Sequence, residues 1–66
     1  MTDLFPDAEI PLEAQIECVE RDLRMRQRVY ERQVARGNMS QKQADREITL
    51  MTAVLMTLKS LQDKER

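Results

Sequence analysis

Residues 34–44 read Val-Ala-Arg-Gly-Asn-Met-Ser-Gln-Lys-Gln-Ala, and this stretch decides the fold. Gly37 is the only glycine in the chain. Glycine readily adopts the left-handed backbone conformation that often follows the last residue of a helix. Ser40 and Gln43 fit the Ser-x-x-Gln capping box with which many helices begin. The stretch therefore predicts the end of one helix, a tight turn and the start of a second helix.

The sequence before this turn has the periodicity of a long helix. Pro11 suits the first turn of a helix, where its missing N–H costs no hydrogen bond. At about 100° per residue, six apolar side chains fall within about 60° of one another. They are Leu12, Ile16, Val19, Leu23, Tyr30 and Val34. We expect a helix over residues 11–36, preceded by a flexible N-terminal arm at residues 1–10.

The sequence after the turn predicts a second amphipathic helix, over residues 41–62. Its apolar stripe consists of Ala44, Ile48, Met51, Leu55 and Leu58. Two long helices joined by so few residues must lie antiparallel. The predicted fold is all-α, an antiparallel helical hairpin that makes residues 11–66 a single domain.

One interface between two helices cannot cover all of the apolar side chains. Burial of a single stripe on each helix leaves a further set partly in water: Cys18, Met25, Val29, Leu50, Val54 and Leu61. Pairing of two hairpins into a four-helix bundle is the simplest way to cover this set, because two-fold dimers are the commonest oligomers. We therefore expect a homodimer with these six residues in its interface.

The composition argues against an enzyme and against a metal or cofactor site. The chain has 66 residues, one cysteine, no histidine and one glycine. It can form neither an intrachain disulfide nor a Cys/His zinc cluster, and it lacks a glycine-rich phosphate loop. Cys18 has no histidine base to activate it, and packing as a small hydrophobic residue is favoured over a redox role. No apolar run approaches the length of a membrane span and no secretory signal is present, so we expect a cytoplasmic protein.

Charge is divided along the chain although the formal net charge is only −1. Residues 1–20 contain six acids and no base, whereas residues 21–46 contain eight bases and three acids. Arg21, Arg24, Arg28 and Arg32 recur every three or four residues and form an arginine ridge. A ridge of this kind is the best signal for nucleic-acid binding. The nearby acids and the absence of interleaved aromatic residues favour a solvated face or a protein-binding surface instead.

Several charged pairs are spaced for contacts within the first helix. Glu17 with Arg21, Glu20 with Arg24 and Asp22 with Arg26 are four residues apart. Arg26 lies inside the apolar stripe, so it either extends along the seam or reaches an acid such as Glu47 on the second helix or one on another chain. For Tyr30, core packing with the hydroxyl toward solvent and a role in partner binding are equally supported.

The string from residue 11 to residue 58 also resembles a family of small helical-hairpin proteins of Mu-like and other temperate phages. The shared elements are Pro11-Leu12-x-Ala14-Gln15-Ile16, Arg28-x-Tyr30-x-Arg32, Gly37-x-Met39, Ala44-Asp45-x-Glu47-Ile48 and Met51-x-Ala53-Val54-Leu55. These are mainly helix-packing positions. Relatives often have proline directly after the tyrosine, whereas Glu31 stands here, which puts a kink typical of the family in doubt.

The resemblance implies a function that periodicity and charge do not. The family includes quorum-sensing anti-activators of Pseudomonas phages. A member is expected to bind a host LuxR-type transcription activator at its DNA-binding region and also to inhibit the type IV pilus assembly ATPase. The residues add plausibility, because an acidic surface can occupy a basic DNA-binding surface. The expected partner-binding residues are Glu13, Glu17, Glu20, Arg24, Arg28, Tyr30 and Arg32. A small nucleic-acid-binding phage regulator that uses the arginine ridge is the alternative, and a purely structural module of a larger phage assembly is a third possibility.

Overall fold

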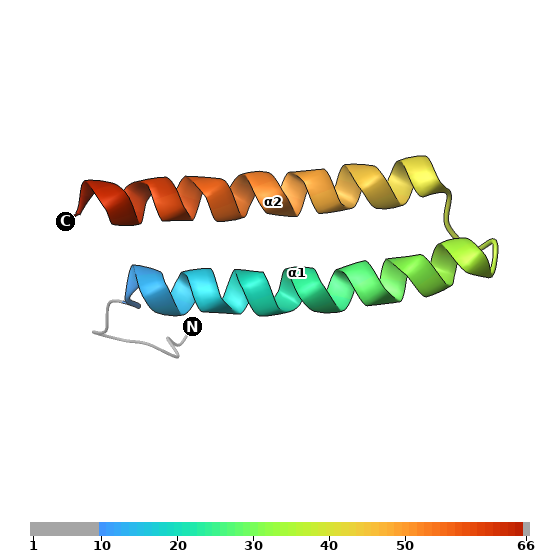
Figure 1. Cartoon of the computed structure of the whole chain (residues 1–66), viewed down its shortest axis with the longest axis horizontal. Helices are drawn as coiled ribbons and strands as arrows, with labels where there is room; N and C mark the ends of the chain where they lie inside the picture. Colours follow the sequence, from blue (N-terminus) through green and yellow to red (C-terminus); the bar gives the residue numbers. More distant parts are fainter. Residues whose placement is uncertain (1–9, 66) are drawn as a thin grey trace, which may run out of the picture.

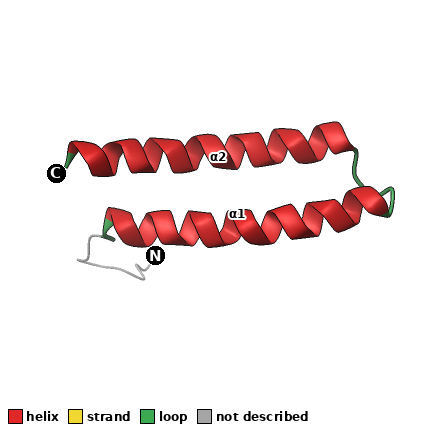
Figure 2. Ribbon diagram, in the orientation of Figure 1, coloured by secondary structure: helices red, strands yellow, loops and turns green. Residues whose placement is uncertain are grey.

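The computed structural model describes residues 10–65, which form a two-helix hairpin (Figure 1). Helix α1 spans Leu12–Ala35 and helix α2 spans Gln41–Lys64. The helices lie side by side and run in opposite directions, and the described residues contain no strand (Figure 2). The predicted all-α antiparallel hairpin is confirmed, with each helix end within two residues of its predicted position. Of the predicted arm, residues 1–9 lie outside the described residues.

The turn has the hydrogen bonds of a Schellman motif. Gly37 adopts a φ of 80°, in the left-handed region. Its N–H donates to the carbonyl of Val34 at 3.0 Å, and the N–H of Asn38 donates to the carbonyl of Gln33 at 2.9 Å. These two bonds satisfy carbonyl groups that the end of α1 would otherwise leave unpaired. The only glycine of the chain therefore stands where the backbone requires it.

The two helices begin in different ways. At the start of α2, the Ser40 Oγ accepts a hydrogen bond from the Gln43 N–H at 3.0 Å, as the capping box predicts. At the start of α1, Pro11 precedes the helix with φ −59° and provides no side-chain cap. The Gln15 side chain instead donates to the carbonyl of Ile10 at 2.9 Å, which ties the residue before Pro11 to the first turn.

The layer between the helices is thin. Only Ile16 and Ala44 are buried among the described residues, at 7% and 4% exposure. The other members of the two predicted stripes are half-buried: Leu12, Val19, Leu23, Tyr30, Val34, Ile48, Met51, Leu55 and Leu58. Both stripes therefore face the partner helix as predicted. Each of them still leaves apolar surface in contact with water.

Candidate protein-binding surfaces

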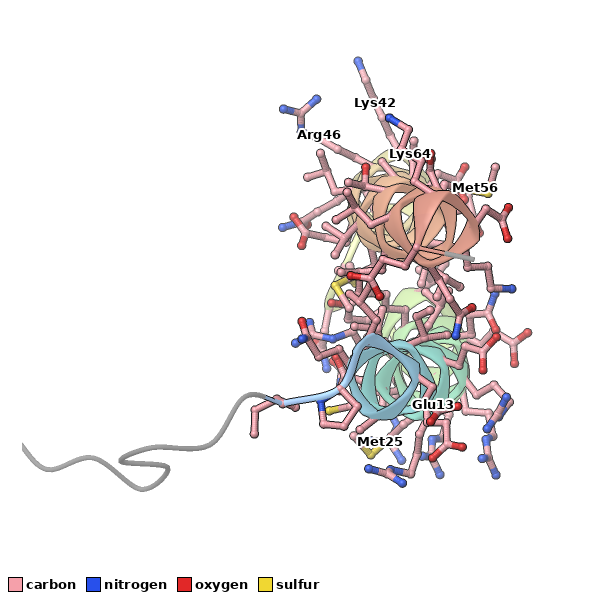
Figure 3. The ribbon with its side chains drawn as sticks, turned by 90° about the vertical axis from the view of Figure 1, so that its left-hand side faces the viewer. Glu13, Met25, Lys42, Arg46, Met56 and Lys64 are labelled. Atoms are coloured by element: carbon pink, nitrogen blue, oxygen red, sulfur yellow. The ribbon has the colours of Figure 1, made fainter. Side chains whose placement is uncertain are left out.

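The first candidate surface is acidic and lies toward the open end of the hairpin. Glu13 (Figure 3) and Glu17 are exposed on α1. Neither forms an ion pair within the described residues. Glu20 is half-buried, and its Oε2 lies 3.2 Å from the Nζ of Lys59 on α2. Of the three expected acidic contact residues, two therefore present available carboxylates, while the third links the two helices.

The second candidate surface is the arginine ridge of α1. Arg21, Arg24, Arg28 and Arg32 are all exposed. None of them forms an ion pair within residues 10–65. The spacing had suggested that Glu17 would pair with Arg21 and Glu20 with Arg24, but neither pair forms in the described chain. The guanidinium groups of the ridge are thus available to acidic groups from outside.

Arg26 and Tyr30 form a polar cluster with Asp22. The Nε of Arg26 donates to the Oδ2 of Asp22 at 2.7 Å, and its Nη1 donates to the hydroxyl of Tyr30 at 3.0 Å. The pKa of Arg26 is raised above its ordinary value, first by the Asp22 hydrogen bond and then by the Tyr30 hydrogen bond. Of the expected partners, Asp22 is the one that Arg26 meets, and Glu47 is not. The cluster fixes the Tyr30 side chain rather than leaving its hydroxyl to solvent alone.

A groove of about 920 Å³ runs between the helices beside the turn, and we call it the turn groove. Its apolar lining comes from Tyr30, Val34 and Ala35 of α1 and from Ala44 and Ile48 of α2. Its polar lining on α1 consists of Arg24, Gln27, Arg28 and Glu31, and on α2 of Gln41, Asp45 and Thr49. Of the predicted partner-binding residues, the structure brings together Arg24, Arg28 and Tyr30 here. It places Arg32 and the three acids outside.

Apart from Arg24 and Arg28, the polar residues of the turn groove were not predicted from the sequence as binding residues; they are Gln27, Glu31, Gln41, Asp45 and Thr49. Glu31 and Asp45 each lie about seven residues from Asn38, one on either side of the turn. In an antiparallel hairpin, positions equally distant from the turn lie at the same level. The equal distance of Glu31 and Asp45 from the turn, together with the direction of each side chain, could have predicted that both line the groove. The periodicity of one helix alone cannot predict it.

The residues expected at a dimer interface lie on more than one side of the hairpin. Leu50, Val54 and Leu61 are 45–50% exposed and fall within about 40° of one another on α2. Met25 is 54% exposed and points away from α2 on the far side of α1 (Figure 3). Cys18 is exposed with a free thiol, and Val29 is half-buried. Leu50, Val54 and Leu61 thus form one apolar ridge along a side of α2, which we call the α2 ridge. Met25 does not extend this ridge, because it points away from α2.

Met56 provides another exposed apolar side chain. It is 63% exposed on α2 and projects to one side of the hairpin (Figure 3). Lys42, Arg46 and Lys64 extend from the side of α2 opposite α1. The outer side of α2 is therefore basic.

Two kinds of feature are absent from residues 10–65. Neither helix has an apolar stretch long enough to cross a membrane. No group of three or more cysteine or acidic side chains in this part of the chain is arranged to hold a metal ion.

Comparison with protein-family models, with curated proteins and with solved structures gives no match for this chain. The structure therefore supports the description as a small two-helix hairpin. The resemblance to phage hairpin proteins remains a prediction from the motifs.

Proposed function

We propose that this chain is a non-enzymatic, phage-encoded inhibitor that acts in the host cytoplasm by stoichiometric binding to host proteins. The first target is a LuxR-type quorum-sensing activator, whose DNA binding it blocks, and the second is the type IV pilus assembly ATPase. Both targets come from the family resemblance. The observation that carries a binding role is the amount of exposed apolar surface on a regular hairpin, with Met25, Leu50, Val54, Met56 and Leu61 at 45–63% exposure.

The acidic surface supports the choice of the first target. A DNA-binding surface is basic because it contacts phosphates, and carboxylates on a helix can occupy the same positions. Glu13 and Glu17 are four residues apart, so they lie on neighbouring turns of one side of α1. Both are exposed and unpaired within the described residues. This pair is the part of the chain that we propose to meet the basic surface of the regulator.

Self-association is part of the same proposal. Leu50, Val54 and Leu61 are exposed and share one side of α2. A second hairpin packed on it would remove these side chains from water, at about 25 cal/mol for each Å² of apolar surface covered. We propose that the active form is a homodimer and that the α2 ridge lies in its interface.

Co-purification with a LuxR-type regulator tests the first target. Tagged hairpin should retain the regulator and release it from promoter DNA in a gel-shift assay. Replacement of Glu13 and Glu17 by lysine should weaken retention by about tenfold or more, because like charges then face each other. The double variant Asp63→Lys, Glu65→Lys is the matched control, since it reverses two exposed acids at the same open end of the hairpin but on α2. Failure of every LuxR-type regulator to be retained would remove this target.

The nucleic-acid alternative is favoured by one observation, the exposure of the four arginines of the ridge without ion pairs in the described chain. If the ridge binds phosphates, affinity for duplex DNA should fall steeply with salt. Replacement of Arg24 or Arg28 by alanine should then reduce the slope of log K against log salt by about 1 for each lost contact. A salt-independent or undetectable affinity would exclude this alternative.

A further inference from the structure

The turn groove is as long as a binding site for a short helix. Along α1 its lining runs from Arg24 to Ala35, about 16 Å at 1.5 Å per residue, and along α2 it runs from Gln41 to Thr49, about 12 Å. These lengths correspond to between two and three helical turns. A helix placed between two antiparallel helices can contact both of them at ordinary packing distances. The groove is therefore long enough for one face of an amphipathic helix.

The floor of the groove is apolar and only partly covered by the hairpin itself. Val34 and Ile48 are half-buried, and both line the groove. Ala44 is 4% exposed and also lines the groove. Its methyl group lies in the layer between the helices and is too small to fill the groove above it. An occupant must present apolar side chains to this floor to gain from displacing water.

The two walls differ in charge, and this difference specifies the occupant. On the α1 wall, Arg24 and Arg28 are exposed, lie one turn apart and form no ion pair within the described residues. On the α2 wall, the Oδ1 of Asp45 accepts a hydrogen bond from the Nε2 of Gln41 at 2.9 Å, which holds that carboxylate at the rim. Glu31 is the only acid on the α1 wall. Two arginines therefore face one acid on the α1 wall, and this excess of positive charge favours an occupant whose carboxylates reach Arg24 and Arg28.

We infer that the turn groove binds an amphipathic helix of a partner protein, with acidic residues beside its apolar stripe on the flank that lies along α1. This inference builds on the proposed protein-binding function but uses a different surface from the Glu13 and Glu17 pair. The occupant gains apolar contact with Val34 and Ile48, and its carboxylates pair with Arg24 and Arg28.

The groove remains open when the proposed dimer forms. On α2, Asp45 and Thr49 line the groove. At about 100° per residue, Leu50 and Val54 point roughly 100° to 180° away from them. A second hairpin seated on the α2 ridge thus leaves the groove free. Seating the ridge of another copy in the groove would be a head-to-tail contact, which builds open chains rather than closed dimers. A partner helix is therefore a better occupant than a second copy.

Designed peptides test the inference without knowledge of the natural partner. The first probe is a fluorescently labelled three-turn helix with a leucine stripe, glutamates on one flank and lysines on the other. The second has the same stripe with lysines on both flanks. The first should bind at least about tenfold more tightly than the second, because only it offers carboxylates to Arg24 and Arg28. Equal binding of the two probes would overturn the inference.

Charge reversal on the hairpin supplies the reciprocal measurement. The double variant Arg24→Glu, Arg28→Glu should reverse the preference between the two peptides. The double variant Arg21→Glu, Arg32→Glu changes two ridge residues outside the groove lining and should leave the preference unchanged. Equal effects of the two double variants would show that the peptide is attracted to the whole arginine ridge. That result would contradict binding in the turn groove. Circular dichroism of each variant checks that the helices are intact.

Mapping by NMR identifies the surface that the peptide contacts. Methyl shifts on addition of the first probe should concentrate on Val34, Ala44 and Ile48. Shifts concentrated on Leu50, Val54 and Leu61 would overturn the assignment. A peptide of residues 41–65 is the third probe, and tighter binding of this peptide than of the first probe would identify a second copy as the occupant instead. These readouts are independent of co-purification with a LuxR-type regulator, so the proposed target and the groove can fail separately.

Discussion

The turn and the layer between the helices are specified in very different ways. Around the turn, a positive φ at Gly37, two Schellman hydrogen bonds and the Ser40 cap act within a few residues. Between the helices, only Ile16 and Ala44 are buried among the described residues. Local sequence therefore determines where the chain reverses, whereas the packing that follows is sparse. A hairpin of this kind has a well-defined shape and a limited interior, and its remaining apolar surface is available to other molecules.

Truncation of the interior should have the largest effect. Ile16→Ala removes part of the most buried large side chain of the described chain and should lower the free energy of unfolding by about 3 kcal/mol. Urea denaturation followed by circular dichroism measures this loss. Ile10→Ala is the control, because Ile10 is 39% exposed and precedes the helix. A loss below about 1 kcal/mol would mean that the layer between the helices contributes little.

A side chain at the turn should have the next largest effect. Gly37→Ala should cost about 1–2 kcal/mol, because the φ of 80° is unfavourable for an L-residue. A Cβ at this position meets no atom within 4 Å, so the cost comes from the backbone and not from a clash. Gly37→Asn should cost less, because asparagine tolerates the left-handed region better. Equal stabilities of all three proteins in thermal unfolding would contradict the observed turn.

Loss of the cap on α2 should have a smaller effect. Ser40→Ala removes the acceptor of the Gln43 N–H and should cost about 1 kcal/mol. Ser60→Ala is the matched control, since Ser60 is exposed in the interior of α2, where alanine is the better helix former. The same denaturation experiment should separate the two variants. If Ser60→Ala proved the more destabilising, the cap would have no energetic role.

The ion pair across the hairpin should have the smallest effect. Glu20 and Lys59 join α1 to α2 at 3.2 Å, but their side chains are 35% and 49% exposed. A double-mutant cycle should give a coupling of about 0.5 kcal/mol or less, because exposed pairs are screened by solvent. The coupling should vanish near 1 M salt, where the Debye length is about 3 Å. A coupling that persists in high salt would mean that Glu20 and Lys59 are less exposed to solvent than the structure shows.

The fold was predictable because its decisive signals are local. Gly37 and Ser40 mark the turn, and the two apolar stripes identify the faces that meet. The partner of Arg26 was only partly predictable, since several acids lie within reach of so long a side chain. The geometry selects Asp22, one turn earlier, and adds the Tyr30 hydroxyl. The turn groove depends on the relative placement of two helices, so no pattern within one helix reveals it.

The exposed apolar side chains also show what periodicity can and cannot give. The sequence placed Leu50, Val54 and Leu61 outside the first stripe, and the structure leaves them 45–50% exposed. The sequence grouped Met25 with them, although Met25 points to the far side of α1 (Figure 3). Angles on one helix give the direction of a side chain only relative to that helix. A surface shared by two helices needs their packing as well.

Sedimentation equilibrium combined with circular dichroism tests most directly whether the hairpin needs a further surface to cover its apolar side chains. At micromolar concentration we predict twice the mass of one chain and high helicity, with both falling together on dilution. The double variant Leu50→Glu, Val54→Glu should sediment as a single chain with reduced helicity. A wild-type chain that sediments as a monomer and keeps its full helicity on dilution would contradict the account.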